Sequence, residues 1–158
     1  MHIRPLDPSD AAEVDLVTQR MRLTLVDVLG AERGEQMYSL DWLRRRLLSH
    51  VDGTHTGAVL VARDGALLGH TILRVEEEIG WFSTTYVEPA ARRRGVARAL
   101  VRAGEAWLLR HPVRTLATNT GAHNTPLIRL FEGLGYSVTV AEGEMVRLTR
   151  PAQGKIAP

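Results

Sequence analysis

The residues best suited to chemistry are three consecutive arginines followed by a glycine, Arg92 to Gly95, with the small Ala97 two positions later. The apolar spacing on both sides predicts a strand before this run and a helix after it. The first turn of a helix has unpaired N–H groups and the positive end of the helix dipole. Gly95 and Ala97 would let a bulky anion approach that backbone, and the guanidinium groups would add charged donors. The run therefore predicts an anion-binding loop of the kind that holds phosphate groups.

Two other interpretations of the arginine run have to be weighed. In a plain surface helix, a cation at the N-terminus opposes the dipole at a cost of about 0.3–1 kcal/mol. Three in a row are therefore unfavourable unless an anion binds there. A nucleic-acid surface would need interleaved aromatic residues and a strong basic field, whereas the net charge is only +2. The segment also has neither the Gly-Lys-Ser/Thr of a Walker loop nor a dinucleotide fingerprint.

The elements that must position this loop follow from the hydrophobic pattern. Strands are expected over residues 1–6, 58–62, 66–75, 79–87, 113–118, 136–140 and 145–149, and helices over residues 8–29, 39–50, 96–111 and 124–134. Asp7 is expected to cap the first helix, with Pro8 in its first position. Tight turns join the second, third and fourth strands into an antiparallel meander. A whole helix separates the fourth strand from the fifth, so these two are expected to pair in parallel.

The pattern as a whole predicts an α/β fold class: a mixed, mostly antiparallel sheet of about six to seven strands flanked by about four helices, in three layers. The 158 residues fit one domain, which we expect over residues 1–150 with a flexible C-terminal tail over 151–158.

Composition excludes several classes of protein. The chain has no cysteine, so disulfides, thiolate metal sites and a cysteine nucleophile are ruled out, and we expect no metal. The polar start, with Pro5 and Pro8, is unlike a signal peptide, and no apolar run reaches the ~20 residues that cross a bilayer. We therefore expect a cytoplasmic protein without membrane or nucleic-acid partners.

Two motifs resemble one known family. The run Arg92 to Ala97 resembles the Arg/Gln-x-x-Gly-x-Gly/Ala motif with which N-acetyltransferases of the GNAT superfamily hold the pyrophosphate of acetyl-CoA. The preceding Tyr86-Val87-Glu88-Pro89 and the following Leu100 are similar to that family's strand end and first helical core leucine. The segment Asn124 to Tyr136 resembles the family's Asn-x-x-Ala-x-x-Leu-Tyr-x-x-x-Gly-Phe. The order and spacing of these motifs extend the resemblance over nearly all of the chain.

The resemblance implies the GNAT fold with acetyl-CoA as cosubstrate. In that family the pantetheine arm enters a gap between two parallel strands and bonds like an added strand. Main-chain groups of Tyr86 and Val87 would contact the arm, and N–H groups from about Arg93 to Ala99 would hold the pyrophosphate. Asn124 would contact the pantetheine or phosphate side, although it is equally suited to cap a helix. The cofactor-binding residues implied are Tyr86, Val87, Arg92, Arg93, Arg94, Gly95, Val96, Ala97, Arg98, Ala99, Asn124 and Phe131.

The resemblance breaks down at the catalytic groups. Phe131 stands where the family has a tyrosine, seven residues after the asparagine, that protonates the leaving thiolate. Some members place a carboxylate base near the start of the strand before the loop, but residues 81–84 contain none. The acidic run 76–78 is expected in a hairpin turn at the far edge of the sheet.

Other titratable side chains supply no clear substitute. His70 and His123 are more typical of structural positions. Glu88 would lie beside the phosphate site, away from the thioester. Tyr86 and Tyr136 stay as candidate acids, and the catalytic acid and base are left unassigned.

The function implied is transfer of an acetyl group from acetyl-CoA to a primary amine of a small molecule, peptide or protein, by a monomer or homodimer. Phe131 keeps an alternative open, an acyl-CoA-binding protein of the same fold without efficient catalysis. The acceptor is not specified, because the first two helices carry no recognisable motif.

Overall fold

Seven strands form a single sheet in the computed structural model, which describes residues 1–29 and 39–152. The strands lie in the order β1-β2-β3-β4-β5-β7-β6. Their bounds are β1 His2–Pro5, β2 Gly57–Asp64, β3 Ala66–Glu76, β4 Ile79–Val87, β5 Thr115–Gly121, β6 Ser137–Glu142 and β7 Met145–Pro151. Neighbouring strands are antiparallel except β4 and β5, which are parallel. The predicted mixed sheet is confirmed, and the parallel pair is the expected one.

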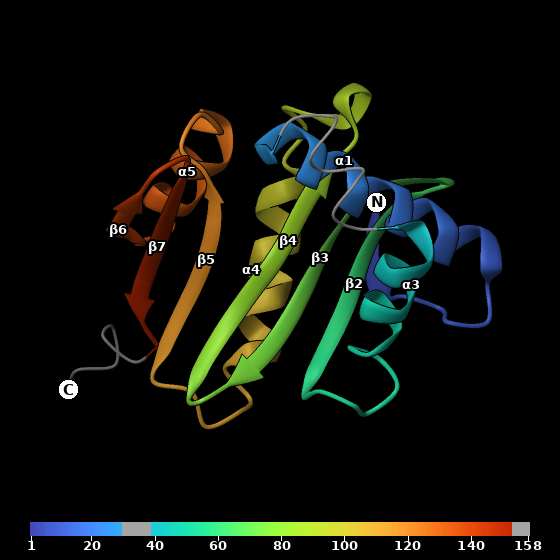
Figure 1. Cartoon of the computed structure of the whole chain (residues 1–158), viewed down its shortest axis with the longest axis horizontal. Helices are drawn as coiled ribbons and strands as arrows, with labels where there is room; N and C mark the ends of the chain where they lie inside the picture. The colour runs from blue at the N-terminus through green and yellow to red at the C-terminus, as the bar shows by residue number, and fades with distance from the viewer. Residues whose placement is uncertain (30–38, 153–158) are drawn as a thin grey trace.

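Helices cover both faces of this sheet. The helices of the described residues are α1 Ala11–Leu29, α3 Leu40–Leu48, α4 Val96–Leu108 and α5 Thr125–Gly133, with a 3-10 turn, η1, at Pro89–Ala91. Figure 1 shows α1 and α3 in front of the strands β2 to β4 and α4 behind the sheet. One buried apolar cluster joins α4 and α5 to the sheet and another joins α1 and α3 to it. The predicted three-layer α/β architecture is therefore confirmed.

The first helix begins later than its sequence signals predict. The side chain of Asp7 accepts hydrogen bonds from the N–H and hydroxyl of Ser9, at 2.9 and 2.6 Å. That local turn uses the carboxylate expected to cap the helix. Asp10 takes the capping role instead, since its Oδ1 accepts from the N–H of Glu13 at 3.1 Å. The N-terminal cap is thus three residues further along the chain than predicted.

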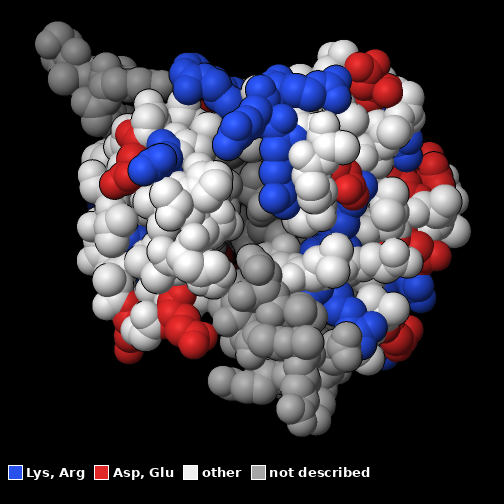
Figure 2. All heavy atoms as spheres, turned by 90° about the horizontal axis from the view of Figure 1, so that it is seen from above, with Lys and Arg blue, Asp and Glu red and all other residues white. Residues whose placement is uncertain are grey.

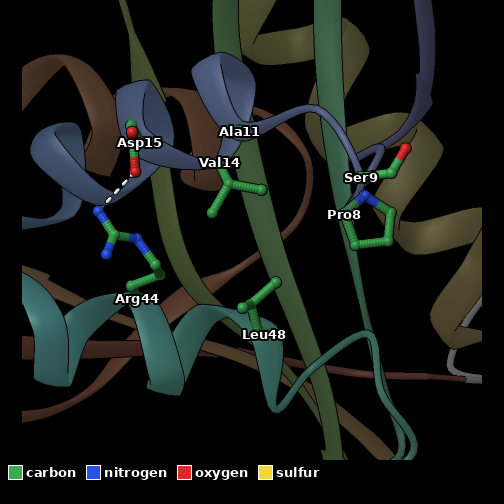
Figure 3. Close-up of a pocket in the computed structure, with 7 residues that line it drawn as sticks. All are labelled: Pro8, Ser9, Ala11, Val14, Asp15, Arg44 and Leu48. Atoms are coloured by element: carbon green, nitrogen blue, oxygen red, sulfur yellow. Dashed lines mark hydrogen bonds and ion pairs between the residues drawn. The ribbon is translucent and has the colours of Figure 1, made fainter.

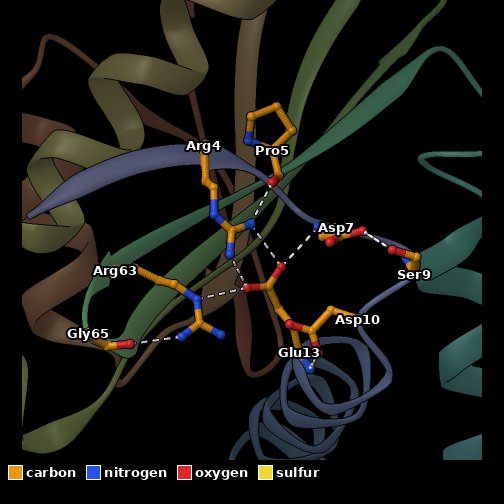
Figure 4. A network of polar contacts seen from close by, with 8 residues as sticks. All are labelled: Arg4, Pro5, Asp7, Ser9, Asp10, Glu13, Arg63 and Gly65. Atoms are coloured by element: carbon orange, nitrogen blue, oxygen red, sulfur yellow. Dashed lines mark hydrogen bonds and ion pairs between the residues drawn. The ribbon is translucent and has the colours of Figure 1, made fainter.

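Glu13 ties the start of α1 to the edge of the sheet (Figure 4). Its carboxylate accepts hydrogen bonds from both terminal nitrogens of Arg4, from Nε of Arg63 and from the N–H of Asp7, at 2.7 to 3.0 Å. The side chain is fully buried. Burial by itself raises the pKa of Glu13, but the hydrogen bonds lower the pKa by more than burial raises it. The pKa of Glu13 therefore falls to about 2. The carboxylate is therefore ionised at neutral pH and holds β1, β2 and α1 together.

A close approach between α4 and β4 sets the position of the predicted loop. A Cβ atom on Gly104 would lie 2.5 Å from Cε1 of Phe82, so only glycine allows this spacing. Leu100 and Val101, also on α4, are fully buried in the same cluster. Because α4 packs against β3 and β4, its N-terminus is fixed near the end of β4.

The C-terminal end of β7 differs from the expected tail. Pro151 is still part of β7, paired with Thr115. Ala152 is buried, and its N–H donates to the carbonyl oxygen of Arg114 at 2.9 Å. These two residues belong to the sheet and its core, and residues 153–158 lie outside the described part of the chain.

Candidate functional site

The parallel strands β4 and β5 separate partway along their length and form a fork. Their pairing runs from Ile79 opposite Thr115 to Phe82 opposite Thr118 and ends there. Ser83 is an extra residue in the β3–β4 ladder, because Phe82 and Thr84 pair with consecutive residues of β3. Such a bulge bends its strand. Beyond it, the facing edges of β4 and β5 have no ladder partner among the described residues, so an extended chain could bond there.

The loop from Glu88 to Gly95 leads from the open end of the fork into α4. Gly95 is the N-cap and has a φ of +77°, and the non-glycine Arg93 has a φ of +63°. Left-handed backbone at a non-glycine residue is uncommon and concentrates at binding sites. The first bond of the helix ladder runs from the N–H of Ala99 to the carbonyl of Gly95. In the part of the chain that is described, the N–H groups of residues 95–98 therefore have no acceptor.

The three arginines of the loop have different surroundings. Arg92 donates from Nε to the carbonyl oxygen of Val87 at 3.1 Å. Arg94 lies 3.9 Å from the Asp64 carboxylate, both side chains being more than half exposed. Arg93 has no ion-pair partner among the described residues, and its side chain is exposed. Figure 2, which views the molecule from the open end of the fork, shows basic side chains gathered around the start of α4, beside a hollow. An anion seated on the free N–H groups would therefore meet positive charge.

The other residues expected at the site lie around the same fork. Tyr86 and Val87 end β4, and Val87 is 8% exposed. Val96 is buried under the loop, whereas Ala97 and Ala99 are half-buried and Arg98 is exposed. The structure thus brings the residues of both sequence segments, 86–87 and 92–99, to one end of the sheet.

Asn124 caps α5 on the other side of the fork. Its Oδ1 accepts from the N–H of Leu127 at 3.4 Å, and its Nδ2 donates to Oγ1 of Thr120 at 3.3 Å. The capping role that the sequence suggested is confirmed. A ligand contact would have to use the remaining hydrogen-bonding capacity of this amide.

Phe131 is a core residue in this structure. It is fully buried and lies between the rings of Phe82 and Tyr136, with centroids 5.4 and 4.9 Å away. The phenol of Tyr136 donates to Oε2 of Glu105 at 2.7 Å, and Arg150 binds the same oxygen at 3.1 Å. Burial and the neighbouring Glu105 carboxylate raise the pKa of Tyr136 well above its usual value. Tyr136, a candidate acid from sequence, is therefore held in a structural hydrogen bond on the α4 side.

Sequence reasoning missed Arg20, a buried cation beside the end of β4. Arg20 is 4% exposed, forms an ion pair with Glu88, donates to the carbonyl oxygen of Leu67 at 3.1 Å and lies 5.6 Å from the centroid of the Tyr86 ring. The signal was present, because Arg20 lies three residues after the buried Val17 on the same stripe of the helix. A charged residue on an apolar helix face predicts a buried partner.

His70 is the other buried polar side chain of this region. Its ring stacks on Tyr86 with centroids 6.0 Å apart. It is 0% exposed, and neither ring nitrogen has a hydrogen-bond partner among the described residues. Burial, helped by the nearby Arg20 charge, lowers the pKa of His70 to about 3. His70 is thus neutral at physiological pH, in keeping with the structural position expected for it.

Other features of the molecule lie away from the fork. The acidic run forms the β3–β4 hairpin turn, at the opposite end of β4 from the arginine loop, as expected. A cavity of about 370 Å³ lies between the start of α1 and α3, where its charged residues Asp15 and Arg44 are paired at 2.6 Å (Figure 3). It is lined by Pro8, Ser9, Ala11, Val14, Asp15, Arg44 and Leu48. The described residues contain neither a cluster of three or more potential metal ligands nor a helix long and apolar enough to cross a membrane.

Comparison with known proteins connects this geometry to one family. Residues 22–136 match the model of the acetyltransferase (GNAT) family. The mycothiol acetyltransferase of Cellulomonas flavigena is 32% identical over an alignment of 97 residues, and the match covers 54% of this chain and 28% of that protein. The chain therefore spans less than a third of the curated relative that it matches.

Solved structures share the fold at low sequence identity. The PaiA N-acetyltransferase of Thermoplasma acidophilum, solved in complex with coenzyme A, superimposes with a TM-score of 0.78 at 13% identity and covers 95% of this chain and 98% of its own. YncA of Salmonella typhimurium, solved with acetyl-CoA, gives a TM-score of 0.74 at 19% identity over 99% of this chain and 96% of its own. At these identities the likeness establishes the fold alone.

Proposed function

The chain belongs to the GNAT acetyltransferase family, and from this membership we propose that it transfers an acetyl group from acetyl-CoA to a primary amine. The observation that carries the proposal is the fork between β4 and β5, whose open end meets the free N–H groups at the start of α4. An elongated ligand with a phosphate-bearing end matches that combination.

The dimensions and charges of the site suit acetyl-CoA. From Ser83 to Val87, the edge of β4 that faces β5 has no ladder partner among the described residues. This stretch is about 16 Å long at ~3.3 Å per residue, which suits an extended pantetheine arm. The N–H groups of residues 95–98 and the arginines around them suit the pyrophosphate. Gly95 has open space where a side chain would stand, so phosphate oxygens could approach the backbone.

One contact modifies the expected pose. The carbonyl oxygen of Val87 already accepts a hydrogen bond from Arg92. A carbonyl oxygen has two lone pairs, so the pantetheine would either share this oxygen or rely on other main-chain groups of β4. Acetyl-CoA supplies the thioester, and this chain's residues hold and orient it.

The proposed reaction needs a neutral amine, and the described residues supply few bases for it. Glu88 is paired with Arg20, His70 is fully buried, and Tyr136 donates to Glu105. An ordinary alkyl amine with a pKa near 10 is only about one part in a thousand neutral at pH 7. An acceptor whose amine has a lowered pKa, or water at the open fork, would meet this need. The same proposal implies that the protein is located in the cytoplasm, where acetyl-CoA is available.

A binding experiment tests the cosubstrate assignment. A ligand at 100 times its dissociation constant stabilises the native state by ~2.7 kcal/mol, which raises the Tm of a domain of this size by roughly 5–10 °C. Acetyl-CoA and CoA should both give this shift. NAD shares the pyrophosphate but lacks the pantetheine arm, so it should give much less. A flat response to millimolar CoA, or an equal response to NAD, would overturn the assignment.

A turnover experiment separates catalysis from simple binding. Phe131 lacks the hydroxyl with which the family usually protonates the thiolate, and this favours, as a second candidate, an acyl-CoA-binding protein without efficient catalysis. Release of free CoA thiol should be followed with a panel of primary amines. Acetyl-CoA binding without amine-dependent release of thiol would select the second candidate.

A further inference from the structure

Arg147 reaches across the sheet to the closed end of the fork. On β7 it pairs with Asn119 of β5, while Ala117 of β5 pairs with Trp81 of β4. The Arg147 guanidinium carbon lies 5.0 Å from the centroid of the Trp81 ring, two strands away from its own backbone. Ala117 is 1% exposed, and its small side chain leaves room for the arginine to pass over β5. The guanidinium therefore lies over the place where β4 and β5 begin to separate.

Two contacts hold this arginine in place. Its Nε donates to Oδ1 of Asn119 at 3.0 Å, and its plane is supported by the indole of Trp81. No Asp or Glu among the described residues forms an ion pair with it. Within the described part of the chain, both terminal nitrogens are thus available as a planar pair of donors, the geometry that binds a carboxylate through two parallel hydrogen bonds.

The face on which Arg147 lies is the accessible one. Leu148, the next residue of β7, is fully buried on the side of α4 and α5, so Arg147 points to the opposite face. Figure 1 shows α1 and α3 in front of β2 to β4, whereas no described helix lies in front of β5, β7 and β6. Arg147 and Asn119 are both exposed. A small molecule can therefore approach the closed end of the fork from this face.

We propose that Arg147 binds a carboxylate of the acceptor, so that the acceptor is a small amine that carries a carboxylate a few bonds from its nitrogen. The inference rests on the proposed function, in which an extended arm enters from the loop and brings the thioester toward the closed end of the fork. The thioester would then lie beside Ser83, the first residue of β4 beyond its pairing with β5. Trp81 precedes Ser83 by two residues, so the two are about 7 Å apart along the strand. A short amino acid spans that distance with its carboxylate on Arg147 and its amine at the thioester.

The same charge would assist the reaction. A guanidinium near the acceptor nitrogen disfavours the ammonium form and so lowers the pKa of the amine. This effect counteracts that of the acceptor's own carboxylate, which by itself favours the ammonium form. The acceptor would then need less help from a protein base, and Glu88, His70 and Tyr136 are already paired or fully buried.

The test compares amino acids with their amides, which keep the amine and lose the negative charge. The parent and Arg147→Gln are each assayed at saturating acetyl-CoA with three amino acids and with the amide of each. The amino acids are glycine, 3-aminopropanoate and 4-aminobutanoate. The quantity measured is the ratio of kcat/KM for the acid to kcat/KM for the amide. Hydrogen bonds to charged groups predict that Arg147→Gln lowers this ratio about 10- to 100-fold for the best chain length. Equal use of acid and amide by the parent, or an unchanged ratio in the variant, would overturn the proposal.

A control and a binding measurement keep the result interpretable. Arg45→Gln removes a charge from an arginine that is 70% exposed on α3, and it should leave the acid-to-amide ratio unchanged. Binding of the N-acetylated acid and of its amide is measured by calorimetry with CoA present, for the parent and for Arg147→Gln. Stronger binding of the acid, lost in Arg147→Gln, supports the carboxylate site even if turnover is undetectable. Equal or absent binding of the two rejects it, while failure of CoA itself to bind rejects the proposed function.

Discussion

The side chain of Arg92 folds back onto the strand that leads into its own loop, and its Nε donates to the carbonyl oxygen of Val87 at 3.1 Å. Its neighbours do not share this role, since Arg94 makes a 3.9 Å contact with Asp64 between exposed side chains. One arginine of the run therefore joins the end of β4 to the loop, whereas the other two have exposed side chains. This difference within a run of identical residues leads to the first prediction.

Arg92→Gln and Arg93→Gln should respond differently to salt. Both variants are expected to weaken CoA binding about 3- to 10-fold at low ionic strength, because each removes a charge near the phosphates. At 0.5 M salt, screening shortens the range of exposed charges, so the deficit of Arg93→Gln should nearly vanish. The deficit of Arg92→Gln should persist, because the loop has lost its bond to β4. Calorimetric titration with CoA at two salt concentrations measures both, and identical salt dependence would contradict the assignment.

Gly95→Glu should weaken CoA binding about 100-fold with only a modest loss of stability. A side chain at this position meets no atom within 4 Å, but the φ of +77° disfavours any residue except glycine by roughly 1–2 kcal/mol. The carboxylate would repel the phosphates and cover the free N–H groups, so we expect affinity to fall on the order of 100-fold.

Gly53→Glu is the matched control for this substitution. Gly53 has a φ of +90°, also meets nothing within 4 Å, and lies in the loop between α3 and β2. The Gly53→Glu variant should lose about as much Tm as Gly95→Glu does, while its CoA affinity stays at the parent's value. If the two variants bound CoA equally well, the anion-binding loop would be assigned wrongly.

Glu13 should be a major source of acid sensitivity. Its pKa is lowered from 4.5 to about 2 in the folded protein, so it contributes stability above pH 4.5 that is lost as the pH falls toward 2. The lowered pKa corresponds to a contribution of about 3 kcal/mol to the free energy of unfolding at neutral pH. Glu13→Gln should therefore lower the Tm by roughly 5–10 °C at pH 7, and its stability should fall less steeply than the parent's between pH 5 and 2.

Asp41→Asn serves as the comparison for Glu13→Gln. Asp41 also pairs with an arginine, Arg45, but both side chains are 70% exposed at 3.5 Å. Exposed pairs at this helical spacing contribute about 0.3–0.5 kcal/mol. Thermal unfolding from pH 2 to 8 should show little change for Asp41→Asn. A loss of Tm as large as that of Glu13→Gln would mean that the buried Glu13 network stabilises the fold no more than an exposed ion pair does.

Tyr136→Phe should affect stability and leave the pH dependence of catalysis unchanged. The phenol donates to Glu105 in the core, and its pKa is raised above the usual value by burial and by that carboxylate. Removing the hydroxyl is expected to cost about 1–2 kcal/mol, because Glu105 keeps its contact with Arg150. The pH profile of acetyl transfer should keep its shape. A basic limb that disappears in the variant would show that Tyr136 does donate a proton.

Much of the fold was predictable from the sequence because its signals are local. The strand at 79–87 was predicted with its observed bounds, and the parallel partner near 115 followed from the helix between them. Gly95 and the arginines marked the loop, and Asn124 marked the start of α5. Such signals depend on the spacing of apolar residues and on backbone conformations that few residue types accept. Neighbouring residues alone decide both.

Tertiary structure decided which polar groups meet. Glu13 is joined to Arg63, 50 residues away, and Arg147 reaches Trp81 across β5, and no spacing along the chain encodes either contact. The cap of α1 also moved from Asp7 to Asp10, because Ser9 occupied the nearer carboxylate. Whether a charged side chain is paired, buried or available to a ligand depends on the strands and helices that packing brings beside it. That information exists only once β4, β5 and β7 lie side by side and α1 is seated on the sheet.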